Sequence, residues 1–315
     1  MSLQPLKILF FRLYMAVLKF ATWVLNFRKP EVFSGTGSSL VLCEHIAKSQ
    51  VKNLLVVTDE MLFKLGLLNP MLARLNELGV ATTVYDGIKP DPTIQQIETG
   101  VTLIKEKQCT AILAVGGGSS IDAAKAIATR VKNGYPIAWM AGLMRVAFRP
   151  MPLYAVPTTA GTGSETTIAA VVSDPANKRK FAIMDPKLVP VAAALDGALM
   201  TGLPPAITAA TGMDALTHAV EAYISRNALK RTDVEALEAT KLIMENLPKV
   251  MKDGQDVVAR QAMAEASFKA GVAFTSAGVG YVHAIAHNMG AYYHVPHGLA
   301  NAIIMPQVLD YSLPE

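Results

Sequence analysis

The feature that most constrains the fold of this chain is an alternation of short apolar runs with helical patterns between residue 39 and about residue 199. The runs NLLVVTDE, ATTVYDG and TAILAVGGGSS have the length and composition of buried strands, and helical patterns at residues 61–78 and 93–107 separate them. Strands that alternate with helices pack as a parallel sheet with helices on both faces. The sequence therefore predicts an α/β part with a doubly wound, Rossmann-like sheet.

The pattern changes near residue 200. Before this point, the segment TTIAAVVSDPANKRKFAIMD predicts a hairpin with its turn at residues 174–177. After GLPPAI, glycine and proline become rare and four long helical patterns follow, at residues 209–225, 230–250, 257–275 and 282–292. We therefore expect an α/β domain at residues 31–200 and an all-α domain at residues 201–315.

Residues 1–30 differ from the rest because they are strongly apolar yet basic. Lys7, Arg12 and Lys19 interrupt the segment, so no uncharged run reaches the roughly 18 residues that a membrane span needs. Arg12, Lys19 and Asn26 fall on one side of a helix, which predicts a basic amphipathic helix in peripheral contact with a membrane surface. The alternative is a helix that docks on the protein's own body or on a second copy. A cleaved signal is disfavoured because no small-residue cleavage site follows.

Charge and cysteine content limit the classes of partner. The formal net charge is only +4, and no run of lysine and arginine interleaved with aromatic residues occurs beyond the N-terminus. This composition argues against nucleic-acid binding and favours small-molecule partners. The two cysteines, Cys43 and Cys109, are far apart, which fits a reducing compartment. We expect a cytoplasmic protein, with the membrane surface as its other possible location.

The run GGGSSIDAAKAIA after the strand pattern TAILAV is a candidate phosphate-binding turn. Glycines allow the backbone to approach a phosphate, and the helix that follows offers unpaired N–H groups and a partial positive charge. The run is not G-x-G-x-x-G, and glycine turns of this kind also occur for geometric reasons alone. The predicted cradle consists of Gly116, Gly117, Gly118 and Ser119.

Two further groups are candidate nucleotide contacts. In AVPTTAGTGSE, the hydroxyls of Thr158, Thr159 and Thr162 are placed to donate to phosphate or ribose, or else to cap a following helix. Asp59 closes the strand pattern NLLVVTD, where a carboxylate commonly accepts hydrogen bonds from the adenosine ribose and repels a 2′-phosphate. This position favours NAD over NADP. The alternative is that Asp59 only caps the next helix.

The stretch VHAIAHNMGAYYHVPHG contains four of the six histidines. His283 and His287 are four residues apart in a helical pattern, as are Asp214 and His218, so each pair leaves one face of a helix. His297 follows a proline at the end of a loop. A lone histidine is usually a hydrogen-bonded core residue, but two such pairs predict a divalent-metal site. The predicted ligands are Asp214, His218, His283 and His297.

Four long motifs occur in order across roughly residues 31–312: GGGSSIDAAKAIA, VPTTAGTGSE, AATGMDALTHAVEAYIS and HAIAHNMGAYYHVPHGLANAIIMP. In these motifs the chain resembles the iron-containing (group III) alcohol dehydrogenase family. The resemblance implies a dehydroquinate synthase-like architecture, in which an NAD(P)-binding α/β domain precedes a helical metal domain, and a homodimer. Family members usually continue past LDYSLPE, so we expect that further C-terminal helices are missing here.

The resemblance also implies an activity and its residues. It implies reversible hydride transfer between a primary alcohol, or the aldehyde in reverse, and NAD, with Fe²⁺ as the Lewis acid and Zn²⁺ as the alternative metal. It assigns the same four metal ligands and places His287 beside the substrate. Because His287 lies one turn from His283, its imidazole is suitably placed to relay the proton between the substrate oxygen and solvent. The implied cofactor contacts are Asp59, Asp91, Gly117, Gly118, Thr158, Thr159 and Lys180.

Other functions remain open at this point. A glycerol dehydrogenase or a hydroxyacid–oxoacid transhydrogenase would share the fold, and a transhydrogenase would need no added NAD. A non-catalytic protein that binds nucleotide and metal at a membrane is the alternative from another class.

Overall fold

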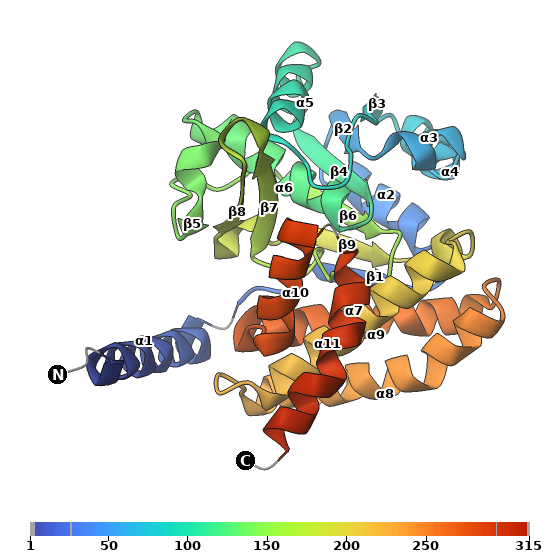
Figure 1. Cartoon of the computed structure of the whole chain (residues 1–315). Helices are drawn as coiled ribbons and strands as arrows, with labels where there is room; N and C mark the ends of the chain where they lie inside the picture. The colour runs from blue at the N-terminus through green and yellow to red at the C-terminus, as the bar shows by residue number, and fades with distance from the viewer. Residues whose placement is uncertain (1–3, 26, 294, 314–315) are drawn as a thin grey trace.

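A computed structural model describes residues 4–25, 27–293 and 295–313. A six-stranded, all-parallel sheet has the order β1-β9-β6-β4-β2-β3 (Figure 1). Its strands are β1 (Glu31–Ser34), β2 (Asn53–Val57), β3 (Ala81–Tyr85), β4 (Ala111–Gly116), β6 (Leu153–Pro157) and β9 (Ala192–Leu195). The predicted parallel sheet is confirmed.

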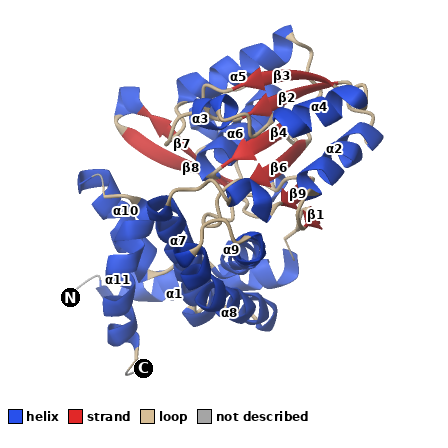
Figure 2. Cartoon of the chain, turned by 90° about the vertical axis from the view of Figure 1, so that its right-hand side faces the viewer, coloured by secondary structure: helices blue, strands red, loops and turns tan. Residues whose placement is uncertain are grey.

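Helices cover both faces of this sheet, as Figure 2 shows. One face packs against α5 (Ile94–Glu106) and α6 (Gly118–Asn133), and the other packs against α2 (Ser38–Lys48) and α4 (Asn69–Glu77). Alternate residues of β2 point to opposite faces, so its side chains are shared between the two apolar cores. A strand buried on both faces is continuously apolar, which explains the unbroken run LLVV.

Three elements of the α/β part differ from the prediction. The expected helix at residues 61–78 is two helices, α3 (Glu60–Lys64) and α4, because Gly66 has a positive φ of 71° and proline occupies the first turn of α4. The strands β1 and β9 were not predicted. The sequence of β9 is AAAL, which lacks β-branched residues and becomes a strand only through burial between β1 and β6.

A smaller sheet lies beside the main one. Its strands β7 (Ala169–Asp174) and β8 (Arg179–Met184) are antiparallel and are joined by the short helix η2 (Pro175–Asn177), so the predicted hairpin is confirmed. The two-residue strand β5 (Gly142–Leu143) pairs with β8. Lys125 of α6 is buried and donates to Thr167 O, Thr167 Oγ1 and Ala169 O, at 2.7–2.8 Å. This lysine fixes the segment that leads from the main sheet into β7.

The chain beyond residue 204 is helical throughout its described part. The four predicted helical patterns are confirmed, and a fifth helix follows them. These helices are α7 (Pro205–Ile224), α8 (Lys230–Lys252), α9 (Val257–Ala277), α10 (Tyr281–Tyr293) and α11 (His297–Ser312). The short helix η4 (Gly197–Met200) connects the two parts, and Gly197 N donates to Gln261 Oε1 of α9 at 2.8 Å. The fold class is confirmed, whereas the domain boundaries at residues 30 and 200 stay a prediction.

The N-terminal segment forms a helix, α1 (Gln4–Leu25), that projects from the body of the molecule (Figure 1). Lys19 Nζ donates to Arg226 O at 2.8 Å near the start of α8. Asn26, which was expected to align with Arg12 and Lys19, lies outside the described residues, as does His294. Among the helices that the structure describes, none has the length and apolar content to cross a bilayer.

The buried lysine of α6 generates a stability prediction. Replacement of Lys125 by methionine leaves the carbonyls of Thr167 and Ala169 without their donor, and we expect it to lower the free energy of unfolding by roughly 2–4 kcal/mol. Lys132→Met, on the exposed side of the same helix, should cost less than about 1 kcal/mol. Chemical denaturation of both variants measures the difference, and equal losses would contradict the assigned role.

Candidate functional site

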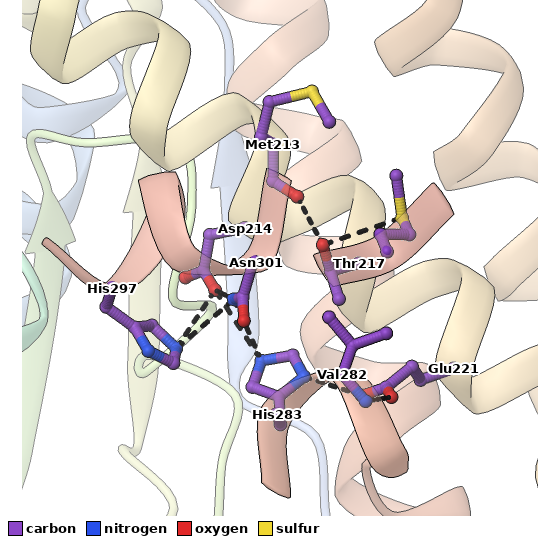
Figure 3. A network of polar contacts seen from close by, with 9 residues as sticks. Met213, Asp214, Thr217, Glu221, Val282, His283, His297 and Asn301 are labelled. Atoms are coloured by element: carbon purple, nitrogen blue, oxygen red, sulfur yellow. Dashed lines mark hydrogen bonds and ion pairs between the residues drawn. The ribbon is translucent and has the colours of Figure 1, made fainter. Parts of the chain in front are cut away.

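Three helices bring the ligand-type residues together (Figure 3). Asp214 and His218 lie one turn apart on α7, and His283 and His287 lie one turn apart on α10. His297 is the first residue of α11, directly after the N-cap Pro296, rather than the end of a loop. Because α11 packs against both α7 and α10, these side chains converge at one point.

The distances between donor atoms fit a shared cation. Asp214 Oδ1 lies 3.3 Å from His297 Nε2 and 3.6 Å from His283 Nε2, and the three ligand atoms all lie within 4.8 Å of one another. Two ligands that each bind one metal at about 2.1 Å in tetrahedral geometry are separated by about 3.4 Å. One carboxylate and two imidazoles at this spacing suit a divalent transition metal.

His218 borders this cluster but is not part of it. Its ring stacks between Phe274, at a centroid distance of 4.1 Å, and His283, at 4.5 Å. Its Nδ1 atom is buried and has no hydrogen-bond partner among the described residues. The structure therefore gathers three of the four predicted ligands and places the fourth alongside them. An unpartnered buried nitrogen is costly, so this atom also fits a role as a ligand.

The protonation states suit metal binding at two of these positions. Burial alone would raise the pKa of Asp214, but the imidazoles of His218, His283 and His297 hold it well below its usual range. Burial lowers the pKa of His218 to about 4. An ionised carboxylate and a neutral imidazole are the forms that bind metals.

His283 is held by a second carboxylate that sequence reasoning missed. Its Nδ1 lies 2.6 Å from Glu221 Oε2, and Glu221 Oε1 accepts from Val282 N at 2.6 Å (Figure 3). Despite burial, hydrogen bonds with Asp214 and Glu221 raise the pKa of His283 to about 9. With its Nδ1–H donated to Glu221, the ring presents Nε2 to Asp214. Glu221 lies seven residues after Asp214 on the same face of α7, and this spacing was the available signal.

Asn301 is a second residue that sequence reasoning missed. Its Nδ2 donates to Asp214 Oδ1 at 2.8 Å and lies 3.4 Å from His283 Nε2 and 3.3 Å from His297 Nε2 (Figure 3). Asn301 is fully buried, and its Oδ1 has no partner among the described residues. It follows His297 by four residues on α11, so the helical spacing again carried the signal.

His287 lies on the solvent side of the cluster. Its ring is 5.9 Å from that of His283 and 5.1 Å from that of His297, and the residue is exposed. Partial desolvation lowers the pKa of His287, and the charges of His297 and His283 add to this effect. The charge of Lys180 on β8 makes a smaller contribution in the same direction. The α/β part therefore reaches the edge of the histidine cluster at this point.

The predicted phosphate loops lie together at the carboxyl edge of the main sheet. Thr158 N donates to Gly116 O at 3.0 Å, which joins the ends of β6 and β4. A Cβ atom at Gly118 would lie 2.8 Å from Thr162 Cγ2, so a larger residue there would force Thr162 to shift. No side chain caps the N-terminus of α6 at Gly117. This edge has an uncapped helix N-terminus beside a loop rich in hydroxyls, as an anion site requires.

The remaining predicted cofactor contacts have partners within the chain. Asp59 Oδ1 accepts from Leu62 N at 3.0 Å and caps α3, so the helix-cap alternative describes its observed contact. The alternative that the threonines of residues 158–162 cap a following helix is wrong, because this loop leads into β7 and not into a regular helix. Lys180 Nζ lies 2.6 Å from Asp91 Oδ2, and both side chains are more than half exposed.

Sequence profiles of one family match both parts of the chain. The profile described as iron-containing alcohol dehydrogenase covers residues 29–197. The profile described as the C-terminal part of the Fe-containing alcohol dehydrogenase family covers residues 208–315.

The chain is also similar to individual proteins. It is 41% identical over 287 residues to the NAD-dependent methanol dehydrogenase of Bacillus methanolicus, across 91% of this chain and 75% of that protein. The crystal structure of a 1,3-propanediol oxidoreductase matches with a TM-score of 0.88 at 40% identity, across 91% of this chain and 76% of that one. A sulfoacetaldehyde reductase from Bifidobacterium kashiwanohense in complex with NAD⁺ matches with a TM-score of 0.84 at 29% identity, across 88% and 74%. With profile matches in both parts and identities near 40%, the chain belongs to the iron-containing alcohol dehydrogenase family.

Proposed function

We propose that this protein is an NAD-dependent alcohol dehydrogenase that transfers hydride reversibly between a primary alcohol and NAD. The observation that carries the proposal is the cluster of Asp214, His283 and His297, whose ligand atoms lie within 4.8 Å of one another and in which Asp214 and His283 are buried. Family membership supports it, and so do relatives whose names specify methanol and 1,3-propanediol. The homodimer stays a prediction.

The donor set fits the metal that the family name implies. Asp214, His283 and His297 would hold the ion, with His218 as the fourth ligand. When bound, a divalent cation acts as a Lewis acid that polarises the substrate oxygen. Fe²⁺ is our choice because it accepts more than four ligands readily, and Zn²⁺ is the alternative because such sites bind it tightly.

The carboxyl edge of the sheet is the proposed nucleotide site. The N-terminus of α6, with Gly116, Gly117, Gly118 and Ser119, would hold the pyrophosphate, because its amides are uncapped. The hydroxyls of Thr158, Thr159 and Thr162 line the same place and would donate to phosphate or ribose. In addition to capping α3, Asp59 would accept from the adenosine ribose, and Asp91 and Lys180 would contact the cofactor near the histidine cluster.

His287 is the proposed proton carrier. Its ring lies next to the rings of His283 and His297 and is also exposed to solvent, so it contacts both the histidine cluster and water. A neutral imidazole there accepts the hydroxyl proton of the alcohol and releases it to water, and in the aldehyde direction it returns a proton. A transhydrogenase would use the same residues, and turnover without added NAD would identify one.

The two histidines of α10 should separate metal binding from turnover. His283→Ala removes a ligand and should abolish both metal retention and alcohol-dependent NADH formation, whereas His287→Ala should keep the metal and slow turnover by about 10²–10⁴-fold. Elemental analysis and an NADH assay with iron-reconstituted protein measure the two effects. Full metal occupancy in His283→Ala would refute the ligand assignment, and unchanged turnover in His287→Ala would refute the proton-carrier role.

The Glu221 contact should control metal affinity without binding the metal. Glu221→Ala removes the acceptor that orients His283 and should weaken metal binding about 10–100-fold, whereas Glu221→Gln keeps an acceptor and should lose less. Competition with a chelator measures the affinity, and circular dichroism verifies the fold. Glu238→Gln, on the exposed face of α8, is the control. Equal affinity in all three variants and the parent would show that Glu221 does not position His283.

Asp59 should set the cofactor preference. Asp59→Asn keeps the α3 cap, because asparagine is as good an N-cap residue as aspartate, but removes the charge that repels a 2′-phosphate. We expect the preference for NAD over NADP, measured as the ratio of kcat/KM values, to fall by at least about tenfold, which corresponds to about 1.4 kcal/mol. An unchanged ratio would mean that Asp59 serves only as a helix cap.

A further inference from the structure

Residues 7–13 of helix α1 present apolar side chains to solvent all around the helix axis. Residues 7–13 are all exposed, and seven consecutive residues make about two turns, so no face of this part of α1 packs on the body. The large apolar side chains that the structure describes between residues 8 and 17 are 49–67% exposed. They are Ile8, Leu9, Phe10, Phe11, Leu13 and Val17. Exposed apolar surface of this extent marks an interaction site.

A second segment, residues 139–149, has the same character, and we call it the basic ridge. Its exposed apolar residues are Trp139, Leu143, Met144 and Phe148, which are 45–69% exposed. Arg145 and Arg149 are exposed among them. The ridge is not loosely attached, because Met140 and Val146 are buried in the main core. The packing of these two residues therefore anchors the segment, while its aromatic and basic side chains are exposed to solvent.

The two segments lie on one side of the molecule. Figure 1 shows α1 and β5, which belongs to the basic ridge, on the same side. Arg28 follows the end of α1 by three residues, a span of at most about 11 Å. Arg28 and Arg149 line one pocket of about 470 Å³. Burial and the charge of Arg149 lower the pKa of Arg28, so the two guanidinium groups are close enough to repel.

The pocket of Arg28 and Arg149 lies at the edge of the main sheet opposite the proposed nucleotide site. The pocket of Arg28 and Arg149 is also lined by Leu153 and Val191, which lie at the start of β6 and just before β9. The glycine cradle follows the other end of the parallel strands. A partner on α1 and the basic ridge would therefore leave the cofactor edge of the sheet open.

The charge of both segments selects the partner. Neither residues 1–30 nor residues 134–151 contain an aspartate or glutamate. In a two-fold contact between two copies, the same patch of each copy faces the other. The cations of the two copies would then face each other, and neither segment supplies a carboxylate to neutralise them. Cations next to exposed apolar side chains instead suit a lipid bilayer, which is apolar inside and can be anionic at its surface.

We propose that α1 and the basic ridge together form a peripheral docking surface for an anionic lipid bilayer. Phe10, Phe11 and the other apolar side chains of α1 enter the boundary between headgroups and acyl chains, and Trp139 and Phe148 reach the same depth. Lys7, Arg12, Arg145 and Arg149 neutralise headgroup charge, and each cation near such a surface strengthens binding by about fivefold. The proposal is independent of the enzymatic activity.

Vesicle flotation tests this with the full chain. The probes are vesicles of phosphatidylcholine alone and vesicles of phosphatidylcholine with phosphatidylserine. We expect binding to the anionic vesicles that weakens as salt is added, because exposed charges are screened. Lys7→Glu with Arg12→Glu should weaken it at least about tenfold. Trp139→Ser with Phe148→Ser should do the same, which tests the ridge separately from α1.

Two control variants carry matched changes elsewhere. Val258→Ser on α9 and Lys241→Glu on α8 alter exposed residues away from both segments and should leave binding unchanged, and circular dichroism verifies that all variants fold. Absence of binding to anionic vesicles, or parental affinity in the Trp139/Phe148 variant, would overturn the proposal. Sedimentation velocity without lipid tests whether a second copy of this chain, and not a membrane, binds to this surface. A dimer that the Trp139/Phe148 variant abolishes would identify a second copy and also overturn it.

Discussion

The structure depends on one buried carboxylate. Asp214 lies inside the helical part, where an ionised group is stable only if charges or donors surround it. Helix α10 supplies His283, and α11 supplies His297 and the Asn301 amide, all within 3.6 Å of Asp214 Oδ1. Glu221 then fixes His283 from the other side. Polar contacts in a low-dielectric interior are strong when complete and costly when broken, so this network constrains how α7, α10 and α11 pack.

The two parts of the chain contribute different chemistry to one region. The parallel sheet ends in glycine and threonine loops, whose amides and hydroxyls suit a phosphate. The helical part offers carboxylate and imidazole, which suit a metal. Their junction is tight, because Gly197 of η4 leaves no room for a side chain against the backbone of α9. The Lys180–Asp91 pair and His287 lie where the α/β part approaches the histidine cluster.

Much of this arrangement was predictable, because it depends on local periodicity. Apolar runs separated by helical patterns predicted the parallel sheet, and the spacing of Asp214 with His218 and of His283 with His287 predicted which residues share a helix face. The strand β9 could not be predicted, because alanine has no preference for strands. These residues form a strand because they are buried between β1 and β6. Glu221, Asn301 and Lys125 were also missed. A single sequence shows that a polar residue lies on a helix face, but not which buried group from another helix meets it there.

The central claim is that Asp214, His218, His283 and His297 hold one divalent transition metal. X-ray absorption spectroscopy at the iron edge of anaerobically purified, iron-reconstituted protein tests it most directly. The account predicts one tightly bound iron per chain, with nitrogen and oxygen neighbours at about 2.0–2.2 Å and the outer-shell scattering of imidazole rings. Iron that is not retained, or a coordination shell of water and carboxylate oxygen without imidazole, would contradict it.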